Sequence, residues 1–415
     1  MNVLVINCGS SSIKYSLFRM ADGRGGERIA SGLIEKIGEP TSRIRHETAG
    51  RKDVRDVEAP DHRAAFALMV RELAEGPGAA IRGLGDIDAV GHRVVHAAER
   101  FAASVRIDRE VLEALEACVP LAPLHNPPNL VGVRAAMELM PDVPHVGVFD
   151  TAFHQTLEPH AFLYAIPYEL YEKHSIRRYG FHGTSHRYVA EVAAEMLGRA
   201  ASEVNLITAH LGNGCSVTAV RGGKSADTSM GLTPLEGLVM GTRSGDIDPA
   251  IVFHLARTLG MNVDRIDAML NRESGLVGLS GVSNDMREIC EAARGGNRRA
   301  ALAIEIFCYR LKKYVGAYTA ALGRVDALVF TGGIGENAPD VRARTCDGLE
   351  GLGYRLDAAR NKAPEKGARD LAESDSEKRI FVIPTDEEAM IARDTARIAA
   401  YLTNSPAPSL LSANP

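Results

Sequence analysis

Two segments of the sequence place hydroxyl, amide and basic side chains around a turn between short apolar runs. The first, residues 7–14, contains three consecutive serines and ends in a lysine. The second, residues 204–220, is interrupted by Gly212-Asn213-Gly214. Glycine permits a positive φ and lets backbone N–H groups approach an anion closely. Each segment therefore predicts a strand–turn–strand that could hold phosphate. A polar hairpin without a ligand is the alternative, and the two segments do not align residue for residue.

An arginine and an aspartate stand where they could act on an anionic substrate. Arg93 follows an apolar run, lies between two histidines and precedes two alanines. Its guanidinium could hold a planar carboxylate through two parallel hydrogen bonds, or form a surface ion pair. Asp150 ends the apolar run 143–149. This is a typical position for chemistry in open α/β folds, and equally one for a helix cap or a loop acid.

A run rich in tyrosine, histidine and arginine contains a third candidate, His182. A zinc site formed with His186 would require both rings on one helical face. Gly183 lies between them, and no acid or cysteine is close in sequence, so the zinc interpretation is weak. Donation of a hydrogen bond from His182 to a charged oxygen is the favoured interpretation.

A third glycine-rich turn, residues 331–337, follows the apolar run 325–330 and precedes a predicted helix. The N-terminus of a helix after such a turn suits the phosphate or ribose of a nucleotide. The turn has neither the Gly-x-Gly-x-x-Gly pattern nor a Walker lysine, so it supports neither a Rossmann nor a P-loop site.

Hydrophobic periodicity predicts the elements that must position these residues. Strands are expected at 3–6, 13–18, 87–90, 143–149, 204–211, 215–220, 325–330 and 380–383. Helices are expected at 61–74, 107–119, 129–139, 250–259, 263–270, 300–321, from about 339, and from 385 to 400. Residues 19–60 are expected to form short strands with loops, and 120–128 and 275–286 to be loops. Thr385 and Glu388 match a capping box.

Composition bounds the class of protein. A chain of 415 residues suggests two domains. With a net charge of -5, it is not expected to bind nucleic acid or a membrane surface in general. Six cysteines without a CxxC pair fit reduced thiols. No run reaches the roughly 18 apolar residues that a spanning helix needs, and no leader is evident. These features predict a soluble, cytoplasmic protein.

The motifs together resemble the acetokinase family, in the family's order from residue 3 to about 395. The matching segments are 5–14 (VINCGSSSIK), 92–96 (HRVVH), 121–127 (LAPLHNP), 148–154 (VFDTAFH), 178–186 (RYGFHGTSH), 210–214 (HLGNG), 240–248 (MGTRSGDID), 331–337 (TGGIGEN) and 384–388 (PTDEE). The resemblance implies a duplicated actin-like (ribonuclease H-like) α/β ATPase fold with an interdomain cleft. Domain I would comprise residues 1–150 plus about 385–403, and domain II residues 151–384. Residues 404–415 would form a disordered tail.

The resemblance also implies a reaction: ATP and acetate giving ADP and acetyl phosphate, reversibly, with Mg²⁺ or Mn²⁺, in a homodimer. Arg93 and Arg243 match the family's active-site arginines, His182 its transition-state stabiliser and Asp150 its catalytic aspartate. Asn7 and Glu387 match metal-associated positions. The apolar pocket around the acyl methyl would be formed by Val95, Leu124, Phe181 and Pro234. Nucleotide-binding positions would be Lys14, His210, Leu211, Gly212, Asn213, Gly214, Asp285, Met286, Arg287, Gly333, Ile334, Gly335, Glu336 and Asn337.

Two points temper the resemblance. The family usually has Gly-Gly where this chain has Ala97-Ala98, so acyl-chain preference is open and propionate kinase remains an alternative. Acetate, with a pKa near that of Glu at about 4.3, carries no proton for a base to remove at neutral pH. We therefore expect Asp150 to orient an arginine or a metal-bound water.

Two further functions compete with this interpretation. A sugar or polyol kinase of the same superfamily would need a general base and a polar array for the sugar. A non-catalytic nucleotide switch would not need Arg93, Asp150, His182 and Arg243 together. Two arginines and an apolar pocket favour a small carboxylate.

Overall fold

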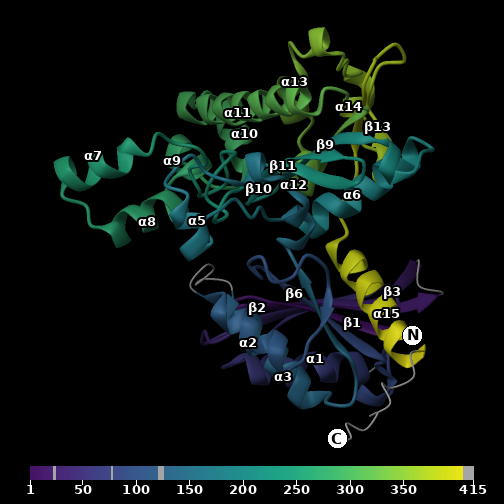
Figure 1. Ribbon diagram of the computed structural model, residues 1–415. Helices are drawn as coiled ribbons and strands as arrows, with labels where there is room; N and C mark the ends of the chain where they lie inside the picture. The colour runs from purple at the N-terminus through teal and green to yellow at the C-terminus, as the bar shows by residue number, and fades with distance from the viewer. Residues whose placement is uncertain (22–24, 76–77, 120–125, 405–415) are drawn as a thin grey trace, which may run out of the picture. The chain divides into compact units, whose positions relative to one another are not determined.

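The computed structural model describes residues 1–21, 25–75, 78–119 and 126–404 (Figure 1). The chain divides into two compact units. Unit 1 comprises Met1–Ala152 and the segment from Asp386 onward, and unit 2 comprises Phe153–Thr385. None of the helices in the described part of the chain has both the length and the apolar character of a membrane span.

Unit 1 is built on one mixed sheet with the order β5-β4-β3-β2-β1-β6-β8-β7. Its strands are β1 (Asn2–Cys8), β2 (Ser12–Ala21), β3 (Gly25–Glu35), β4 (Ser42–Thr48), β5 (Arg51–Val57), β6 (Ala89–Val94), β7 (Val105–Arg106) and β8 (His145–Phe149). Strands β1 to β5 are antiparallel neighbours, whereas β1, β6 and β8 run parallel. The predicted short strands of residues 19–60 are in fact a long β-meander, of which β3 alone has 11 residues.

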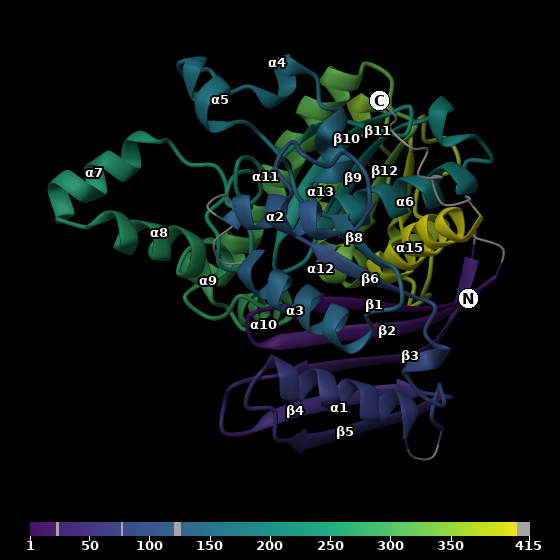
Figure 2. The same ribbon diagram turned by 60° about the horizontal axis from the view of Figure 1, so that its bottom comes forward.

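Helices cover both faces of this sheet because side chains alternate along β1. Leu4 and Ile6 share a core cluster with residues of α1 (His62–Ala74) and α3 (Asn126–Leu139). Val3 and Val5 pack instead against the C-terminal helix α15 (Glu387–Asn404). This two-residue period is that of a strand buried on both faces. Figure 2 shows α1 beside β3, β4 and β5. A further helix, α2 (Arg109–Ala117), completes unit 1.

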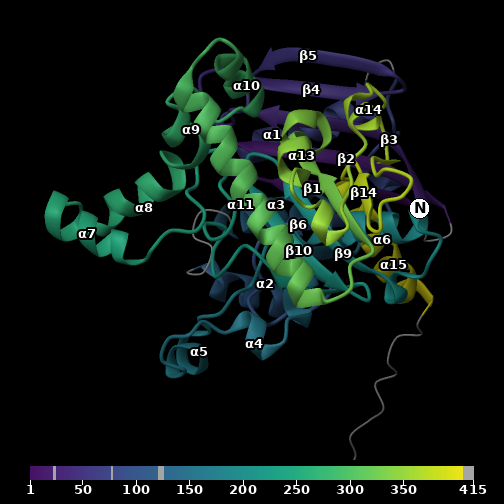
Figure 3. The same ribbon diagram turned by 90° about the horizontal axis from the view of Figure 1, so that it is seen from above.

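Unit 2 is built on a second mixed sheet with the order β11-β10-β9-β12-β14-β13. Its strands are β9 (Asn205–Leu211), β10 (Cys215–Arg221), β11 (Lys224–Thr228), β12 (Ala327–Thr331), β13 (Arg369–Asp370) and β14 (Arg379–Val382). Helix α6 (Gly183–Met196) packs Val189 and Ala193 into the core of this sheet. The 25-residue helix α11 (Arg298–Leu322) crosses the unit and contacts β9 and β10 (Figure 3).

Shorter helices surround this framework. They are α4 (Pro159–Phe162), α5 (Glu169–His174), α7 (Ala250–Leu259), α8 (Val263–Arg272), α9 (Gly275–Ser280), α10 (Met286–Arg294), α12 (Gly332–Asn337), α13 (Pro339–Cys346) and α14 (Ala358–Lys362). Helices α7 and α8 project from the rest of unit 2 (Figure 3).

The two sheets repeat one topology. The series β3-β2-β1-β6-β8-β7 of unit 1 has the same order and the same parallel or antiparallel senses as β11-β10-β9-β12-β14-β13 of unit 2. Unit 1 adds β4 and β5 at one edge. The two glycine-containing turns identified in the sequence therefore lie at equivalent places, between β1 and β2 and between β9 and β10.

Two of the predicted loops contain helical residues. Helix α3 begins at Asn126, so the predicted loop does not extend to Pro128; proline is tolerated in the first helical turn, where its missing N–H is not needed. Residues 120–125 of that loop lie outside the described residues. Of the predicted loop 275–286, Gly275–Ser280 forms α9 and Met286 begins α10.

The predicted capping box at Thr385 and Glu388 was also wrong. Asp386 caps α15, because its Oδ1 accepts a hydrogen bond of 3.0 Å from the Ala389 N–H. Glu388 forms an ion pair with Lys14 instead. The predicted disordered tail from residue 404 lies almost wholly outside the described residues.

Candidate active site

In unit 1, three parallel strands bring three of the predicted residues to one edge of the sheet. Asn7 and Arg93 come next after the paired residues Ile6 and His92 of β1 and β6. Asp150 directly follows β8, the next parallel strand. The carboxyl ends of parallel strands share an edge, which is where open α/β sheets bind ligands.

The central interaction of this edge joins Arg93 to Asp150. The Arg93 Nε donates to Oδ1 at 3.0 Å and Nη2 donates to Oδ2 at 2.7 Å. Asp150 is only 2% exposed. A bidentate pair of this kind fixes the plane of the guanidinium. Asp150 thus has the geometry of a group that orients an arginine.

Further charges gather around this pair at the start of α15. The Glu387 Oε2 lies 3.8 Å from the Arg93 Nε. Glu388 forms ion pairs with Lys14 and with Arg28. Burial acts to lower the pKa of Arg93, but the nearby carboxylates, Asp150 first and then Glu387, outweigh it and raise that pKa. Arg93 therefore stays charged in an acidic neighbourhood.

The same edge offers oxygen atoms that suit a hard divalent cation. Asn7 supplies an amide that forms no hydrogen bond with any described residue, and Asp150 and Glu387 supply carboxylates. Across the described residues, no three His, Cys, Asp or Glu side chains converge as a protein-only metal cluster would. Mg²⁺ usually takes one or two carboxylates together with waters and substrate phosphates, so this donor set fits it.

The residues predicted for the acyl pocket belong to both units, Val95 to unit 1 and Phe181 and Pro234 to unit 2. Val95 in unit 1 is half-buried, and its backbone N–H donates to the Asn129 Oδ1 at 3.0 Å. Leu124 lies outside the described residues. Ala97 is fully buried in a hydrophobic cluster of unit 1. Ala98 has a φ of +48°, a conformation that costs a residue with a Cβ about 1 kcal/mol.

In unit 2, a chain of hydrogen bonds holds His182. This residue adopts the left-handed conformation, with a φ of 57°, at the start of α6. Its Nδ1 lies 2.9 Å from the Ser216 Oγ, which in turn lies 2.7 Å from the His186 Nε2. Its ring stacks on that of His210, with centroids 4.2 Å apart. Burial lowers the pKa of His186 well below its usual value, so this series of hydrogen bonds ends at a neutral imidazole.

Arg243 lies beside His182 and the glycine turn. A Cβ built on Gly214 would lie 3.0 Å from the Arg243 Nη2 and 3.3 Å from the His182 Nε2. The Arg243 Nη1 donates to the Pro234 carbonyl at 2.7 Å. Burial lowers the pKa of Arg243. Within the described chain this arginine forms no ion pair, so its charge is available to an anionic ligand.

A cavity of about 780 Å³ opens next to the same turn. It brings together eight of the predicted nucleotide-binding residues: Gly212, Asn213, Asp285, Met286, Arg287, Gly333, Ile334 and Asn337. Its volume is in the range of small-molecule and cofactor sites. Five other predicted positions of unit 2 do not line it: His210, Leu211, Gly214, Gly335 and Glu336. The Glu336 carboxylate accepts a backbone hydrogen bond from Thr385 N at 3.4 Å, and burial raises its pKa.

Sequence reasoning missed part of the cavity wall. Six further residues line the cavity: Asn284, Cys290, Arg294, Ala338, Pro339 and Asp340. Cys290 and Arg294 follow Met286 at helical spacing on α10. The predicted loop ended at Met286 and the next predicted helix began at residue 300, so no element was expected for the rest of α10. The motif around residues 285–287 would have identified it, had it been extended as a helix.

Comparisons with known proteins agree along the whole chain. Residues 2–393 match the family model described as "Acetokinase family". An acetate kinase of Clostridium botulinum is 52% identical over 400 residues, covering 96% of this chain and 100% of its own. An acetate kinase of Pseudothermotoga lettingae is 54% identical over 399 residues, covering 96% and 97%.

Solved structures agree in fold. The acetate kinase of Porphyromonas gingivalis superposes with a TM-score of 0.91 at 47% identity, covering 96% of this chain and 99% of its own. A propionate kinase from Francisella tularensis gives a TM-score of 0.89 at 45% identity, with the same coverage. The predicted α/β fold of the actin-like type is confirmed. Sequence, motif order and fold together show that this chain belongs to the acetokinase family.

Proposed function

We propose that this protein is an acetate kinase, which transfers the γ-phosphoryl group of ATP to acetate and forms acetyl phosphate and ADP reversibly. One observation carries the proposal: Arg243, which forms no ion pair with a described residue, and the hydrogen-bonded His182 lie against the glycine turn that borders the nucleotide-sized cavity. That arrangement gives the γ-phosphoryl group a cationic partner, Arg243, and a hydrogen-bond donor, His182. The family membership of the chain supports the same reaction.

The chemistry needs little proton transfer. A carboxylate oxygen of acetate attacks the γ-phosphorus while the bond to the leaving ADP oxygen breaks, and acetate is already ionised at neutral pH. Phosphoryl transfer passes through a loose transition state, so the protein mainly positions groups and neutralises charge. Arg243 and His182 would stabilise the charge on the transferred group. The cavity residues would hold the adenine nucleotide.

The groups of unit 1 would serve the acceptor and the metal. Arg93 retains Nη1 for an incoming carboxylate, because Asp150 occupies its Nε and Nη2. Asn7 and Glu387 would hold Mg²⁺, or Mn²⁺, which would neutralise phosphate charge when bound, and Asp150 would orient Arg93 or a metal-bound water. Lys14 would contact the nucleotide phosphates after exchanging its partner Glu388.

The size of the acyl group is the open part of this proposal, with a propionate or short-chain fatty acid kinase as the second candidate. A solved relative with 45% identity is described as a propionate kinase. Ala97 adds its methyl group to the core rather than to an open space, which supports an ordinary acetate-sized pocket. One methylene is worth only about 1–3 kcal/mol, so the difference in rate would be modest.

The protein is expected to act in the cytoplasm, which its six free thiols support, and as a homodimer. Helix α7 has no buried residue, and its Ile251, Phe253 and Leu259 are 42%, 57% and 61% exposed. Apolar exposure of this extent on a projecting helix suits a contact with a second copy of the chain.

The assay of function follows directly. Hydroxylamine traps acyl phosphates, so ATP, Mg²⁺ and acetate should give acetohydroxamate, with kcat/KM falling from acetate to propionate to butyrate. If none of the three acids gave a hydroxamate, the proposed kinase activity would be refuted. A higher kcat/KM for propionate would favour the second candidate.

Asp150→Asn should lower kcat by about a hundredfold or more and raise the Mg²⁺ concentration needed for half-maximal activity. The substitution removes the charge that holds Arg93 and that would attract the metal. Measured kcat against pH and Mg²⁺ checks this. The orienting role would be contradicted if Asp150→Asn kept the normal Mg²⁺ requirement and differed only in losing the pH dependence of kcat that a titrating base produces.

Gly214→Ala should reduce kcat by at least tenfold while thermal stability changes little. Its Cβ would press on the Arg243 Nη2 and the His182 ring, and a misplacement near 1 Å can cost a factor of about a hundred. Gly316→Ala is the control, because Gly316 lies on α11, does not line the cavity, and a Cβ built there meets no atom outside its own helix backbone within 4 Å. Equal kcat of the two variants would contradict the proposal that Arg243 and His182 lie against Gly214 during catalysis.

The dimer can be tested by light scattering at micromolar concentration. The unaltered chain should have the mass of two copies, and Phe253→Glu that of one. Leu302→Glu is the matched control, since Leu302 is 52% exposed but lies on α11. A monomeric unaltered chain, or a dimeric Phe253→Glu variant, would contradict the proposed face.

A further inference from the structure

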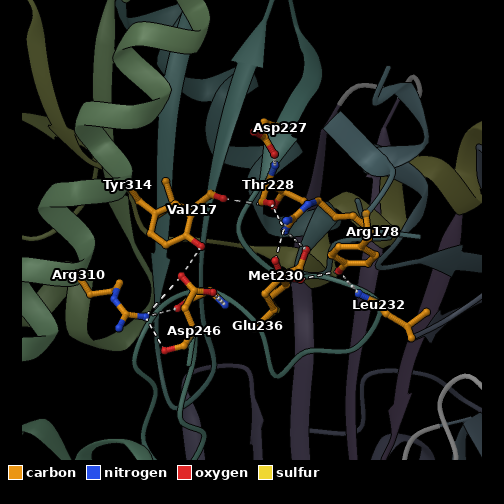
Figure 4. A network of polar contacts seen from close by, with 12 residues as sticks. Arg178, Val217, Asp227, Thr228, Met230, Leu232, Glu236, Asp246, Arg310 and Tyr314 are labelled. Atoms are coloured by element: carbon orange, nitrogen blue, oxygen red, sulfur yellow. Dashed lines mark hydrogen bonds and ion pairs between the residues drawn. The ribbon is translucent and has the colours of Figure 1, made fainter. Parts of the chain in front are cut away.

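A polar network in unit 2 surrounds the loop formed by residues 232–237 (Figure 4). At the start of this loop, the Leu232 N–H donates to the Tyr164 hydroxyl at 2.9 Å. Near its end, both oxygens of Glu236 are engaged: Oε1 accepts from the Arg178 Nη2 at 2.7 Å, and Oε2 accepts from Tyr164. Arg178 also donates to two backbone carbonyls, those of Thr228 and Met230. Tyr164 therefore ties both parts of the loop together.

A second cluster holds the last residue of the loop. The Gly237 N–H donates to the Asp246 Oδ1 at 2.8 Å, and the Asp246 N–H donates back to the Gly237 carbonyl at 2.9 Å. The other oxygen of Asp246 accepts from the Tyr314 hydroxyl at 2.8 Å. Arg310, on the same helix α11, lies 3.4 Å from that oxygen. The long helix α11 thus anchors the loop.

Between these two anchors, the loop presents one carbonyl to the candidate site. The Pro234 oxygen accepts from the Arg243 Nη1 at 2.7 Å. This acceptor is neutral, so it sets the direction of the guanidinium without cancelling its charge. A carboxylate in its place would compete with a phosphoryl group for Arg243. Glu236, two residues further on, is kept from that role because Arg178 and Tyr164 occupy both of its oxygens.

We propose that Glu236 and Asp246 are positioning residues for Arg243, acting through the 232–237 loop and held by Tyr164, Arg178 and Tyr314. This inference rests on the proposed function, in which Arg243 contacts the transferred phosphoryl group. Among the described residues of unit 2, none of the hydrogen bonds of this network reaches a residue that lines the nucleotide cavity. Loosening it should therefore affect the chemical step and leave nucleotide binding intact.

The experiment removes single hydroxyl groups. Tyr164→Phe and Tyr314→Phe should each lower kcat by about tenfold, with the KM for ATP unchanged, because effects of positioning fall on the transition state. Tyr309→Phe is the control: Tyr309 lies on the same helix as Tyr314, is 65% exposed, and its hydroxyl forms no hydrogen bond with a described residue. Unchanged kcat in both test variants would overturn the proposal.

A double-mutant cycle separates positioning from general damage to the fold. In an Arg243→Lys background, Tyr164→Phe should lower kcat by less than twofold, since the guanidinium that it positions is already gone. The same loss in both backgrounds would overturn the proposal and indicate a structural role only. Glu236→Gln serves the same cycle if Tyr164→Phe does not fold.

The failure of the proposed function can be told from the failure of this inference. If the unaltered chain forms no acyl phosphate, the proposed function fails and this inference fails with it. If the unaltered chain is active but the effects of the two substitutions on kcat are additive, only the inference is refuted.

Discussion

The candidate site of unit 2 depends on a positive charge, that of Arg243, which forms no ion pair with any residue that the structure describes. Arg243 is partly buried, and a buried charge is costly unless its surroundings compensate. Here the neutral carbonyl of Pro234, at 2.7 Å, compensates for part of that cost. The two nearby acids, Glu236 and Asp246, each accept hydrogen bonds from basic or phenolic side chains. Because Glu236 and Asp246 accept hydrogen bonds from other side chains, the charge of Arg243 is available to an anionic ligand. The arrangement of unit 2 around the glycine turn follows from this requirement.

The second arginine has the opposite setting. Arg93 is held by both oxygens of Asp150, with Glu387 nearby. These acids more than offset the charge of Arg93. In the proposed function, a substrate carboxylate would therefore bind there only together with a cation. One arginine thus serves as an available charge and the other as an oriented donor. The divalent metal of the proposed function would balance this excess of acidic charge.

The repeated topology explains how the chain produces two such settings. Each sheet begins with a hairpin whose turn contains glycine, and each hairpin is followed by parallel strands. The order of strands and the pairing senses are repeated, although the residues of the two turns are not. In unit 1 the hairpin is flanked by Asn7 and Lys14, whereas in unit 2 the paired positions near the turn are His210 and Ser216. The backbone geometry is shared, and the side chains give each turn its own chemistry.

The sequence by itself determined the kinds of residue and the local elements. The apolar run of β1, the alternation along β2 and the glycines at the turns predicted the hairpins, and the order of the motifs predicted the α/β fold of the family. The local errors arose where contacts with neighbouring residues decide the structure: α9 lies within a predicted loop, and Asp386 rather than Thr385 caps α15. Only the tertiary structure decided which charges are paired. The partners Arg93 and Asp150, or Asp246 and Tyr314, are 57 and 68 residues apart. Whether an arginine is neutralised depends on distances of a few ångströms between such residues, and no local pattern encodes those distances.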